Sequence, residues 1–408
     1  MYKTIAILLS LLLVFGILSC NLDGSGIFLT ISESTEIEDS NLATEPVREI
    51  LYKDGDNMYI LHGTSVKSAD IVIDNPIWTQ YAFKDVLTEK LTPISEAVFV
   101  PGTPNKLVYS SAHYDDGLHS DDGFKSVYVS SFTTPSSPPN SSHVVTGLGN
   151  VKVIDIIIDG SVVYAIIYNQ VSDDIEIYTI DTTSYTSTLV GSFSSLVLPT
   201  SVHFISNGVA DTDKYFIFVC SNDAQGCINS YLKLSDLGIP YSPTELFDSV
   251  FETSSISDDD AKNSPIVGAF AAPIVGAFAD GTTIYLVTYE GILITSNDNF
   301  ISFTKVNAED PMSNVLNAYN SIPITIAKTD TTDLLLIGGL SNIYYSDIST
   351  DAAKPVEFSS TDTFYSNLSS TQVIDFYNVP GDFSFYTATS NKWIWKTTDE
   401  ASASTQLL

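Results

Sequence analysis

A short run of β-forming residues recurs seven times along this chain of 408 residues. Most successive runs start about 50 residues apart, a spacing typical of repeat-built folds. Val, Ile, Tyr and Phe dominate them, and these side chains suit a pleated, half-buried surface. The runs are Met58–His62, Leu107–Ser111, Val162–Tyr168, Tyr215–Cys220, Ile284–Tyr289, Leu334–Gly338 and Phe383–Thr387.

Each run follows a partner run, and turn-forming residues separate most pairs. Asp54-Gly55, Asp159-Gly160 and Asp280-Gly281 are examples, and Gly accepts the positive φ that tight hairpin turns need. The pattern therefore predicts antiparallel hairpins. The partner runs are Glu49–Lys53, Ala97–Val100, Val153–Ile158, Val202–Ser206, Ile274–Ala279, Ile324–Ala327 and Val373–Tyr377.

A third run follows each hairpin, and fainter fourth runs such as Thr188–Phe193 and Val356–Ser359 come after some of them. An outer strand is expected to be less apolar because one of its edges faces water. The third runs are Ile71–Ile73, which is the weakest, Val127–Ser131, Ile175–Ile180, Tyr231–Leu234, Ile292–Thr295, Ile343–Asp347 and Trp393–Lys396.

These repeats predict an all-β chain, and most specifically a seven-bladed β-propeller of four-stranded antiparallel blades over residues 41–408. Closure of such a ring usually needs a strand from the far terminus. Ile27–Ile31 is the candidate, and we expect it beside the final blade near Trp393–Lys396. Two stacked β-sandwiches are the alternative, but the nearly constant spacing favours the propeller.

One interval is longer than the others, in part because residues 265–271 are repeated identically at residues 273–279. A slippage duplication explains this pair. The second copy fits the innermost strand better, since Asp280-Gly281 follows it directly. A register shift by one whole copy is the alternative, because the two copies are identical.

The N-terminal residues indicate where in the cell the protein is sent. Lys3 precedes an apolar run from Ile5 to Leu18, which is too short to span a bilayer comfortably. The run ends in Leu18-Ser19-Cys20 and resembles a bacterial lipoprotein signal, in which a small residue precedes the lipidated Cys. The resemblance implies a signal peptide over residues 1–19 and lipid on Cys20, followed by a polar tether over residues 20–40. An ordinary secretory signal is the alternative.

Two or more acyl chains would anchor the protein stably to a membrane. The expected location is therefore the bacterial cell envelope, at the outer membrane or cell surface in preference to the cytoplasmic membrane.

Cys220 and Cys227 flank a short loop after the second strand of the fourth unit. Because an exported protein meets oxidising surroundings, we expect them to form a disulfide. Two reduced thiols are the alternative.

Ser296-Asn297-Asp298-Asn299-Phe300-Ile301-Ser302-Phe303 resembles the Asp-box of sialidases and related propellers. Ser296, Asp298, Ser302 and Phe303 fit this motif, whereas Phe300 stands where the family has Gly. In that family the motif is a structural turn, so the resemblance implies a fold and no activity. Sialidases hold the substrate carboxylate with three Arg, and Arg48 is the single Arg here.

The formal net charge of -32 disfavours a nucleic-acid partner, because the chain repels phosphate. Carboxylates gather in two regions that we expect on one face of the ring, and they could bind a partner or Ca²⁺. A merely solvated acidic surface is the alternative. The candidate residues are Asp115, Asp116, Asp121, Asp122, Asp258, Asp259 and Asp260.

No catalytic motif stands out, so the sequence favours a monomeric, non-enzymatic protein without a cofactor that binds an unknown protein or glycan. An adhesion role and an envelope scaffold are both compatible with it. The alternative is a glycan-active hydrolase, because a pair of carboxylates across a cleft could lie among the 49 acidic residues.

Overall fold

The computed structural model divides the chain into two compact units, residues 1–41 and residues 42–408. All described residues belong to the second unit. They are residues 46–72, 76–87, 93–111, 127–131, 140–148, 152–169, 171–194, 199, 201–206, 214–219, 230–237, 244–245, 274–281, 283–288, 293–300, 304–305, 323–328, 333–339, 343–348, 372–378, 384–390, 394–398 and 405–407.

The described residues form seven sheets, in which neighbouring strands pair antiparallel, with β5 of the second sheet as the exception. The first sheet contains β1 (Val47–Asp54), β2 (Asn57–His62), β3 (Ser65–Asp70) and β4 (Thr79–Tyr81). The second contains β5 (Phe83–Asp85), β6 (Ile94–Val100), β7 (Lys106–Ser111), β8 (Val127–Ser131) and β9 (Asn140–Val144). The third contains β10 (Lys152–Asp159), β11 (Val162–Asn169), β12 (Asp174–Asp181) and β13 (Thr186–Ser194).

The remaining sheets follow the same plan. The fourth contains β14 (Ser201–Ser206), β15 (Lys214–Val219), β16 (Ser230–Lys233) and β17 (Thr244–Glu245). The fifth contains β18 (Ile274–Asp280), β19 (Thr283–Thr288), β20 (Leu293–Ser296) and β21 (Thr304–Lys305). The sixth contains β22 (Ile324–Lys328), β23 (Asp333–Gly338) and β24 (Ile343–Asp347). The seventh contains β25 (Val373–Asn378), β26 (Phe385–Thr389), β27 (Ile394–Thr397) and β28 (Thr405–Leu407).

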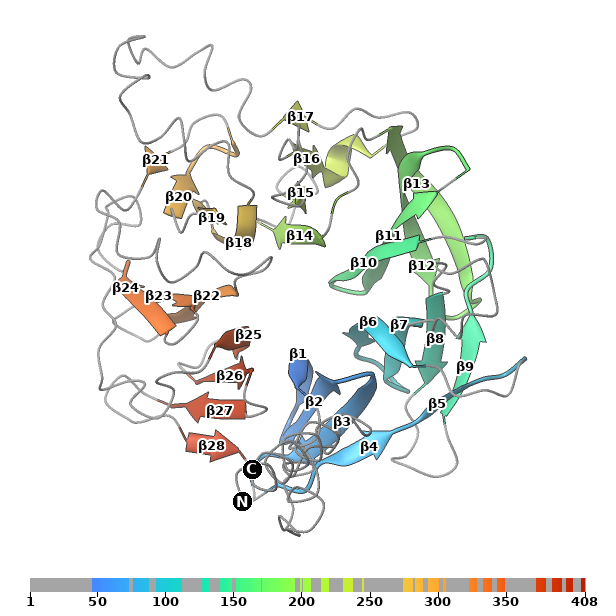
Figure 1. The fold of residues 1–408 in the computed structure, drawn as a ribbon, viewed down its shortest axis with the longest axis horizontal. Coiled ribbons are helices and arrows are strands. Elements are labelled where there is room, and N and C mark those ends of the chain that lie inside the picture. The colour runs from blue at the N-terminus through green and yellow to red at the C-terminus, as the bar shows by residue number, and fades with distance from the viewer. Residues whose placement is uncertain are drawn as a thin grey trace, which may run out of the picture. The chain divides into compact units, whose positions relative to one another are not determined.

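The sheets follow one another around a common centre, with β1, β6, β10, β14, β18, β22 and β25 innermost (Figure 1). Up-and-down sheets in this arrangement make a β-propeller. The all-β prediction is confirmed, since the one described helix is the short 3-10 turn η2 (Leu234–Asp236). In the same described part of the chain, no helix combines the length and the apolar character needed to cross a bilayer.

Tight Gly turns explain why the first two strands of a unit pair as predicted. Asp54 pairs with Asn57 around Gly55, whose φ is 58°, and Asp159 pairs with Val162 around Gly160, whose φ is 60°. Two-residue loops with positive φ match the twist of the adjoining strands. The hairpins read from the sequence therefore form where they were expected.

The third strand of the first sheet differs from its prediction. It spans Ser65–Asp70, before Ile71–Ile73, because a second tight turn at Gly63 (φ 57°) pairs His62 with Ser65. Most of this strand is buried although Lys67, Ser68 and Ala69 are not strongly apolar. A search for apolar runs therefore placed the strand too late.

Two further expectations concern individual strands. The innermost strand of the fifth sheet is the second copy of the duplicated segment, as predicted, and it begins at Ile274. The outer edge of β27, where the sequence suggested Ile27–Ile31, pairs instead with β28. Residues 27–31, residues 265–271 and residues 356–359 lie outside the described residues.

The second sheet has one strand that arrives from the first. After β4 the chain continues into β5, which pairs parallel to β9 at the outer edge of the second sheet. Phe83 and Asp85 are buried there, and Tyr128 donates a hydrogen bond to Asp85 at 3.1 Å. This short strand thus ties two neighbouring sheets together.

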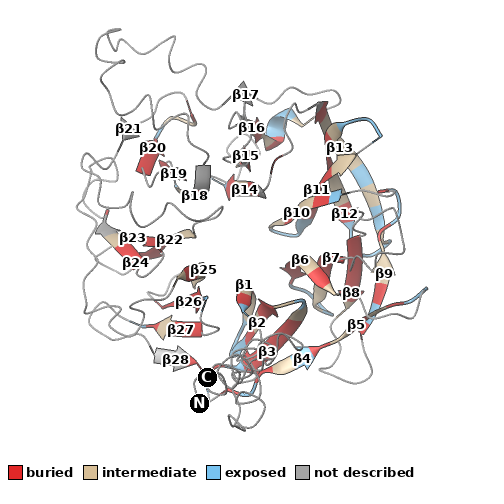
Figure 2. Cartoon of the chain, in the orientation of Figure 1, coloured by how far each residue is buried: buried red, intermediate tan, exposed pale blue. Residues whose placement is uncertain are grey.

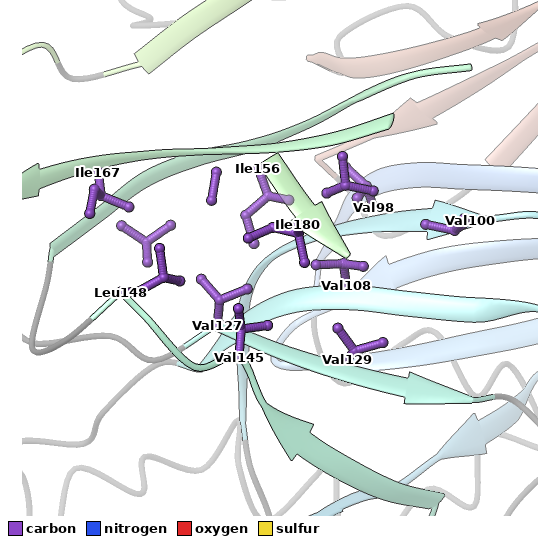
Figure 3. Close-up of a cluster of buried hydrophobic side chains, with 13 residues drawn as sticks. Val98, Val100, Val108, Val127, Val129, Val145, Leu148, Ile156, Ile167 and Ile180 are labelled. Atoms are coloured by element: carbon purple, nitrogen blue, oxygen red, sulfur yellow. The ribbon is translucent and has the colours of Figure 1, made fainter. Parts of the chain in front are cut away.

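Buried residues occur in the strands around the whole ring (Figure 2). Among the described residues, the buried hydrophobic side chains form seven clusters, each shared by two sheets. In the cluster of Figure 3, Val108 and Val127 from the second sheet pack with Ile156 and Ile180 from the third. Another cluster joins Val47 and Met58 of the first sheet to Tyr386 of the seventh. Burying such side chains stabilises the fold by about 1.5–3 kcal/mol each.

Candidate functional site: carboxylates on the innermost strands

Most of the residues singled out from the sequence fall outside the described part of the structure, so their roles stay predictions. They are Cys20, Asp115, Asp116, Asp121, Asp122, Cys220, Cys227, Asp258, Asp259, Asp260, Ser302 and Phe303.

Ser296 and Asp298 lie in a turn that follows β20. The Ser296 hydroxyl donates to Asp298 Oδ1 at 3.0 Å and accepts a hydrogen bond from the backbone N–H of Phe300, also at 3.0 Å. Asn299 and Phe300 have φ values of 58° and 68°. Gly adopts positive φ without strain, so Phe300 holds a backbone conformation that is unfavourable for a residue with a side chain.

Phe300 has a packing role that explains its presence. Its side chain is 3% exposed, and its ring centroid lies 4.8 Å from that of Tyr215 and 4.9 Å from that of Tyr231. Both tyrosines belong to the fourth sheet, whereas Phe300 follows the fifth. The turn therefore connects two sheets, as a structural motif would.

The innermost strands share a second local feature. In five of them the register with the next strand shifts by one residue near the start, which is the mark of a β-bulge. The shifts lie between Val47 and Glu49, Ile94 and Glu96, Val153 and Asp155, Ile274 and Gly276, and Val373 and Asp375.

Four of these bulges are followed by a carboxylate. We call Glu49, Glu96, Asp155 and Asp375 the carboxylate arc. They lie on the first, second, third and seventh sheets, and shared clusters join these sheets in the order seventh, first, second, third. All four side chains are half-buried. The bulges thus bring acids from distant parts of the sequence to one level of the innermost strands.

Asp155 and Asp375 make equivalent hydrogen bonds. Asp375 accepts one from the N–H of Phe376 and one from the N–H of Ile50 on the first sheet, both at 2.8 Å. Asp155 likewise accepts from the N–H of Ile156 at 2.8 Å and from the backbone of Val202 on the fourth sheet. Each carboxylate therefore bridges its own innermost strand to the next one.

Glu49 is the member of the arc with the least favourable surroundings. Among the described residues its carboxylate accepts no hydrogen bond. Burial raises the pKa of Glu49 well above its usual range, and the charges of Asp375, Glu96 and Asp155 raise it further. Only Arg48 acts in the opposite direction. This environment favours a protonated Glu49.

Burial acts in the same direction on the two aspartates. It raises the pKa of Asp155 to about 8, together with the negative charge of Glu96, and it raises the pKa of Asp375 to about 7. The backbone hydrogen bonds of each carboxylate oppose the shift without cancelling it. The arc therefore holds protons close to neutral pH.

Arg48 is largely committed to other contacts. It is the extra residue of the β1 bulge, and its guanidinium donates to the backbone oxygens of Ser95 at 2.6 Å and Gly63 at 3.3 Å. It approaches Glu96 Oε1 at 3.5 Å, and both side chains are 35% exposed. A pair this exposed contributes little, so Arg48 mainly joins the first two sheets.

His203, which follows Val202 on β14, supplies no counter-charge. Its Nε2 is buried and has no hydrogen-bond partner among the described residues. Burial lowers the pKa of His203 to about 4, so the ring is neutral at physiological pH. His203 therefore adds no positive charge to the surroundings of the arc.

The sequence analysis overlooked the arc although a signal for it exists. A β-branched residue, one further residue and then an acid open four innermost strands, as in Val153-Ile154-Asp155 and Val373-Ile374-Asp375. Within any single strand, such an acid looks like an ordinary polar position. Aligning the repeats at this position would have revealed them.

The side chains of the described residues show no grouping that is typical of a metal site. In that part of the chain no three His, Cys, Asp or Glu side chains come together as metal ligands would. The arc as it stands suits a proton or an organic cation better than a calcium ion, which requires six to eight oxygens.

Comparisons with known proteins bear on the fold. The crystal structure of Saccharomyces cerevisiae Sqt1 matches with a TM-score of 0.51 and 12% identity, over 90% of this chain and 86% of that one. A chain of the COPII outer coat vertex on membranes gives 0.50 and 10%, over 80% and 76% of the two chains. The WD40 β-propeller domain of Doa1 gives 0.48 and 8%, over 88% and 94%.

No protein-family model and no curated protein sequence matches the chain. The structural likeness at these identities concerns the fold, and a propeller can host many functions.

Proposed function

We propose that the protein is a lipid-anchored, exported, closed seven-bladed propeller that binds a partner without catalysing a reaction. The blade number is supported by the seven sheets and by the seven clusters that join them. Closure is supported by the contact of the first sheet with the seventh, where Ile50 donates to Asp375.

The observation that carries the binding role is the gathering of four carboxyl groups in the carboxylate arc, where burial keeps protons on three of them near neutral pH. The four carboxyl groups lie near one another on the innermost strands. Arg48 donates mainly to backbone oxygens, and His203 is neutral. A partner that presents an ammonium or guanidinium group would let these carboxyl groups release their protons and would pair with the negative charges that form. The net charge of -32 would also draw such a partner towards the protein.

The binding test uses variants that each replace two carboxyl groups by amides, at different places. Wild type, Glu49→Gln/Glu96→Gln and Asp56→Asn/Asp236→Asn would be titrated with spermidine and with a lysine oligomer at low salt. Asp56 and Asp236 are exposed and lie away from the arc in the chain. We expect the arc variant to lose affinity about tenfold or more per charge pair and the control to change little.

Two outcomes would redirect the proposal. Equal loss in both variants would mean that only the overall charge attracts the cation. Loss confined to a variant of Asp115, Asp116, Asp121 and Asp122 would move the binding site to the acidic loop predicted from the sequence. Calcium titrated in parallel would test the metal prediction for that loop.

The anchor is tested separately, since Cys20 lies outside the described residues. Expression in a bacterium should give a membrane-bound protein whose N-terminal peptide carries acyl chains by mass spectrometry. Cys20→Ser should release the protein from the membrane. A soluble wild-type protein, cleaved elsewhere, would support the ordinary secretory signal instead.

A glycan hydrolase is the second candidate, favoured by the raised pKa of Asp155, about 8, beside the charge of Glu96. A carboxylic acid kept protonated near neutral pH could act as a general acid. However, Asp155 already accepts hydrogen bonds from Ile156 and Val202, which suits a structural acceptor. Turnover in a glycan screen, abolished by Asp155→Asn, would establish this alternative.

A further inference from the structure

The side chain of Arg48 lies among four oxygen acceptors between the first two sheets. Its Nη2 donates to the backbone oxygen of Ser95 at 2.6 Å and approaches Glu96 Oε1 at 3.5 Å. Its Nη1 donates to the backbone oxygens of Gly63 at 3.3 Å and Ile94 at 3.4 Å. The two terminal nitrogens of the guanidinium thus serve separate pairs of acceptors. We call the four acceptors the oxygen cradle.

Backbone hydrogen bonds between three segments of the chain hold the oxygen cradle together. The tight turn at Gly63 joins β2 to β3, and its N–H donates to the backbone oxygen of Pro46, just before β1, at 3.0 Å. The N–H of Ile94, where β6 begins, donates to the backbone oxygen of Thr64 in the same turn at 2.9 Å. Because none of these bonds involves the side chain of Arg48, the cradle should persist when that side chain is replaced.

The equivalent residues of two other sheets show that the fold does not need an arginine at this position. Arg48 is the extra residue of the first bulge of β1, and it is the single Arg of the chain. Ile154 and Ile374 are the extra residues of the bulges in the third and seventh sheets, and each packs against the cluster shared with the following sheet. An apolar side chain therefore suffices to join two sheets here, and the presence of Arg48 calls for another explanation.

We infer that the oxygen cradle is a guanidinium-binding subsite that the chain's own Arg48 fills, and that an arginine side chain of the partner takes its place on binding. The side chain of Arg48 is 35% exposed, so its place can be reached from solvent. Glu96 is the one charged acceptor in the cradle, and its side chain is equally exposed, so this ion pair holds Arg48 only weakly. Arg48 thus acts as a built-in competitor of the partner.

The arrangement of the acceptors favours a guanidinium over an ammonium group. A guanidinium presents donors on separate nitrogens in a planar fork, whereas an ammonium presents all of its donors from one atom. The cradle offers one pair of oxygens to each terminal nitrogen of Arg48, which matches the fork. Glu96 belongs to both the cradle and the carboxylate arc, so the subsite adjoins the proposed binding region. The exchange with a partner's arginine rests on the proposed function, whereas the cradle itself can be tested without it.

Methylguanidinium is the probe for the cradle, because it carries the charged group of an arginine alone. Arg48→Ala empties the cradle, whereas Arg48→Ile removes the same charge and covers the cradle with the side chain that two other sheets use. In calorimetric titrations of Arg48→Ala we expect a dissociation constant on the order of 1 mM, as is reasonable for so small a ligand. Binding to Arg48→Ile and to the wild type should be at least about tenfold weaker. Methylammonium should not distinguish the three proteins.

Two results would overturn the assignment of the cradle. One is the absence of methylguanidinium binding to Arg48→Ala, and the other is equal binding to Arg48→Ala and Arg48→Ile. Circular dichroism would show whether each variant is folded. Should Arg48→Ala fold poorly, Arg48→Thr gives the same comparison, since Thr suits a strand and still leaves the guanidinium position open.

An arginine oligomer tests the exchange with a partner. At low salt Arg48→Ala should bind it about tenfold more tightly than Arg48→Ile, although the two variants have the same net charge. Equal affinities would refute the exchange. If the oligomer binds to none of the three proteins while methylguanidinium binds to Arg48→Ala, the proposed binding role is wrong and the assignment of the cradle stands.

Discussion

Lys214 Nζ lies 2.7 Å from Asp159 Oδ2 and joins the hairpin turn of the third sheet to the start of β15 in the fourth. The two side chains are only 13% and 19% exposed. Contact with water therefore weakens this pair less than it weakens the Arg48–Glu96 pair, whose side chains are 35% exposed. Two ion pairs of similar chemistry should thus differ in their contribution to stability.

Lys214→Met should lower the free energy of unfolding by about 1–3 kcal/mol, because it leaves the charge of Asp159 in a largely buried place without a partner. Urea unfolding measures this change. Glu96→Gln, which breaks the exposed pair, serves as the comparison and should cost less than about 1 kcal/mol. Equal effects would mean that exposure does not decide the strength of these pairs.

Gly338→Ala should destabilise the protein by about 1–3 kcal/mol, because an added Cβ would overpack the contact between two sheets. That Cβ would lie 2.6 Å from Pro323 Cγ and 2.8 Å from Val373 Cγ1. Gly160→Ala is a control of a different kind, since its Cβ meets no atom within 4 Å and only its φ of 60° is unfavourable. It should cost about 1 kcal/mol. Thermal unfolding would rank the two variants, and the opposite order would contradict this assignment.

Phe300→Ala should lower the free energy of unfolding by about 3–5 kcal/mol, as expected when a buried Phe is truncated. The ring is 3% exposed and packs on Tyr215 and Tyr231 of the neighbouring sheet. Phe300→Gly would relieve the positive φ but leave the same cavity, so it should recover only part of the loss. If Phe300→Gly were as stable as the wild type, the left-handed backbone and not the ring would dominate.

Stability should fall as the pH rises from about 6.5 to about 8, because the folded protein binds more protons than the unfolded chain there. Asp155 and Asp375 ionise at about 8 and 7 when folded, against 3.8 otherwise. Their stabilising contribution is complete below pH 3.8 and is lost as the pH rises through the folded values. Urea unfolding at fixed pH measures this, and Asp155→Asn should make the decline shallower.

His203 acts with the opposite sign in a lower range. Its pKa is about 4 in the folded state and 6.5 otherwise, so between these values the unfolded chain binds the extra proton. His203 therefore destabilises the fold as the pH drops below 6.5. On acidification, the free energy of unfolding should rise more steeply in His203→Gln than in the wild type, because the opposing effect of His203 is gone. An unchanged profile would show that His203 is more hydrated than its burial suggests.

The sequence alone predicted the all-β class and the position of nearly every innermost and second strand. Apolar runs and Gly turns are local signals, and residues such as Gly55 and Gly160 fix a hairpin wherever the chain lies. The prediction failed for β3, because Lys67 and Ser68 become buried through their neighbours and not through their own hydrophobicity. It also did not predict β28, the short strand that pairs with β27 from a few residues further along the chain.

The carboxylate arc was decided by the tertiary structure. Glu49 and Asp375 are far apart in the chain, and each follows an ordinary strand start in the sequence. Only the bulges and the packing of the first sheet against the seventh bring them to one level, where burial and mutual repulsion hold protons on them. Local composition determines which strands form, whereas the ionisation of a group depends on every charge and every water molecule that folding places near it or removes.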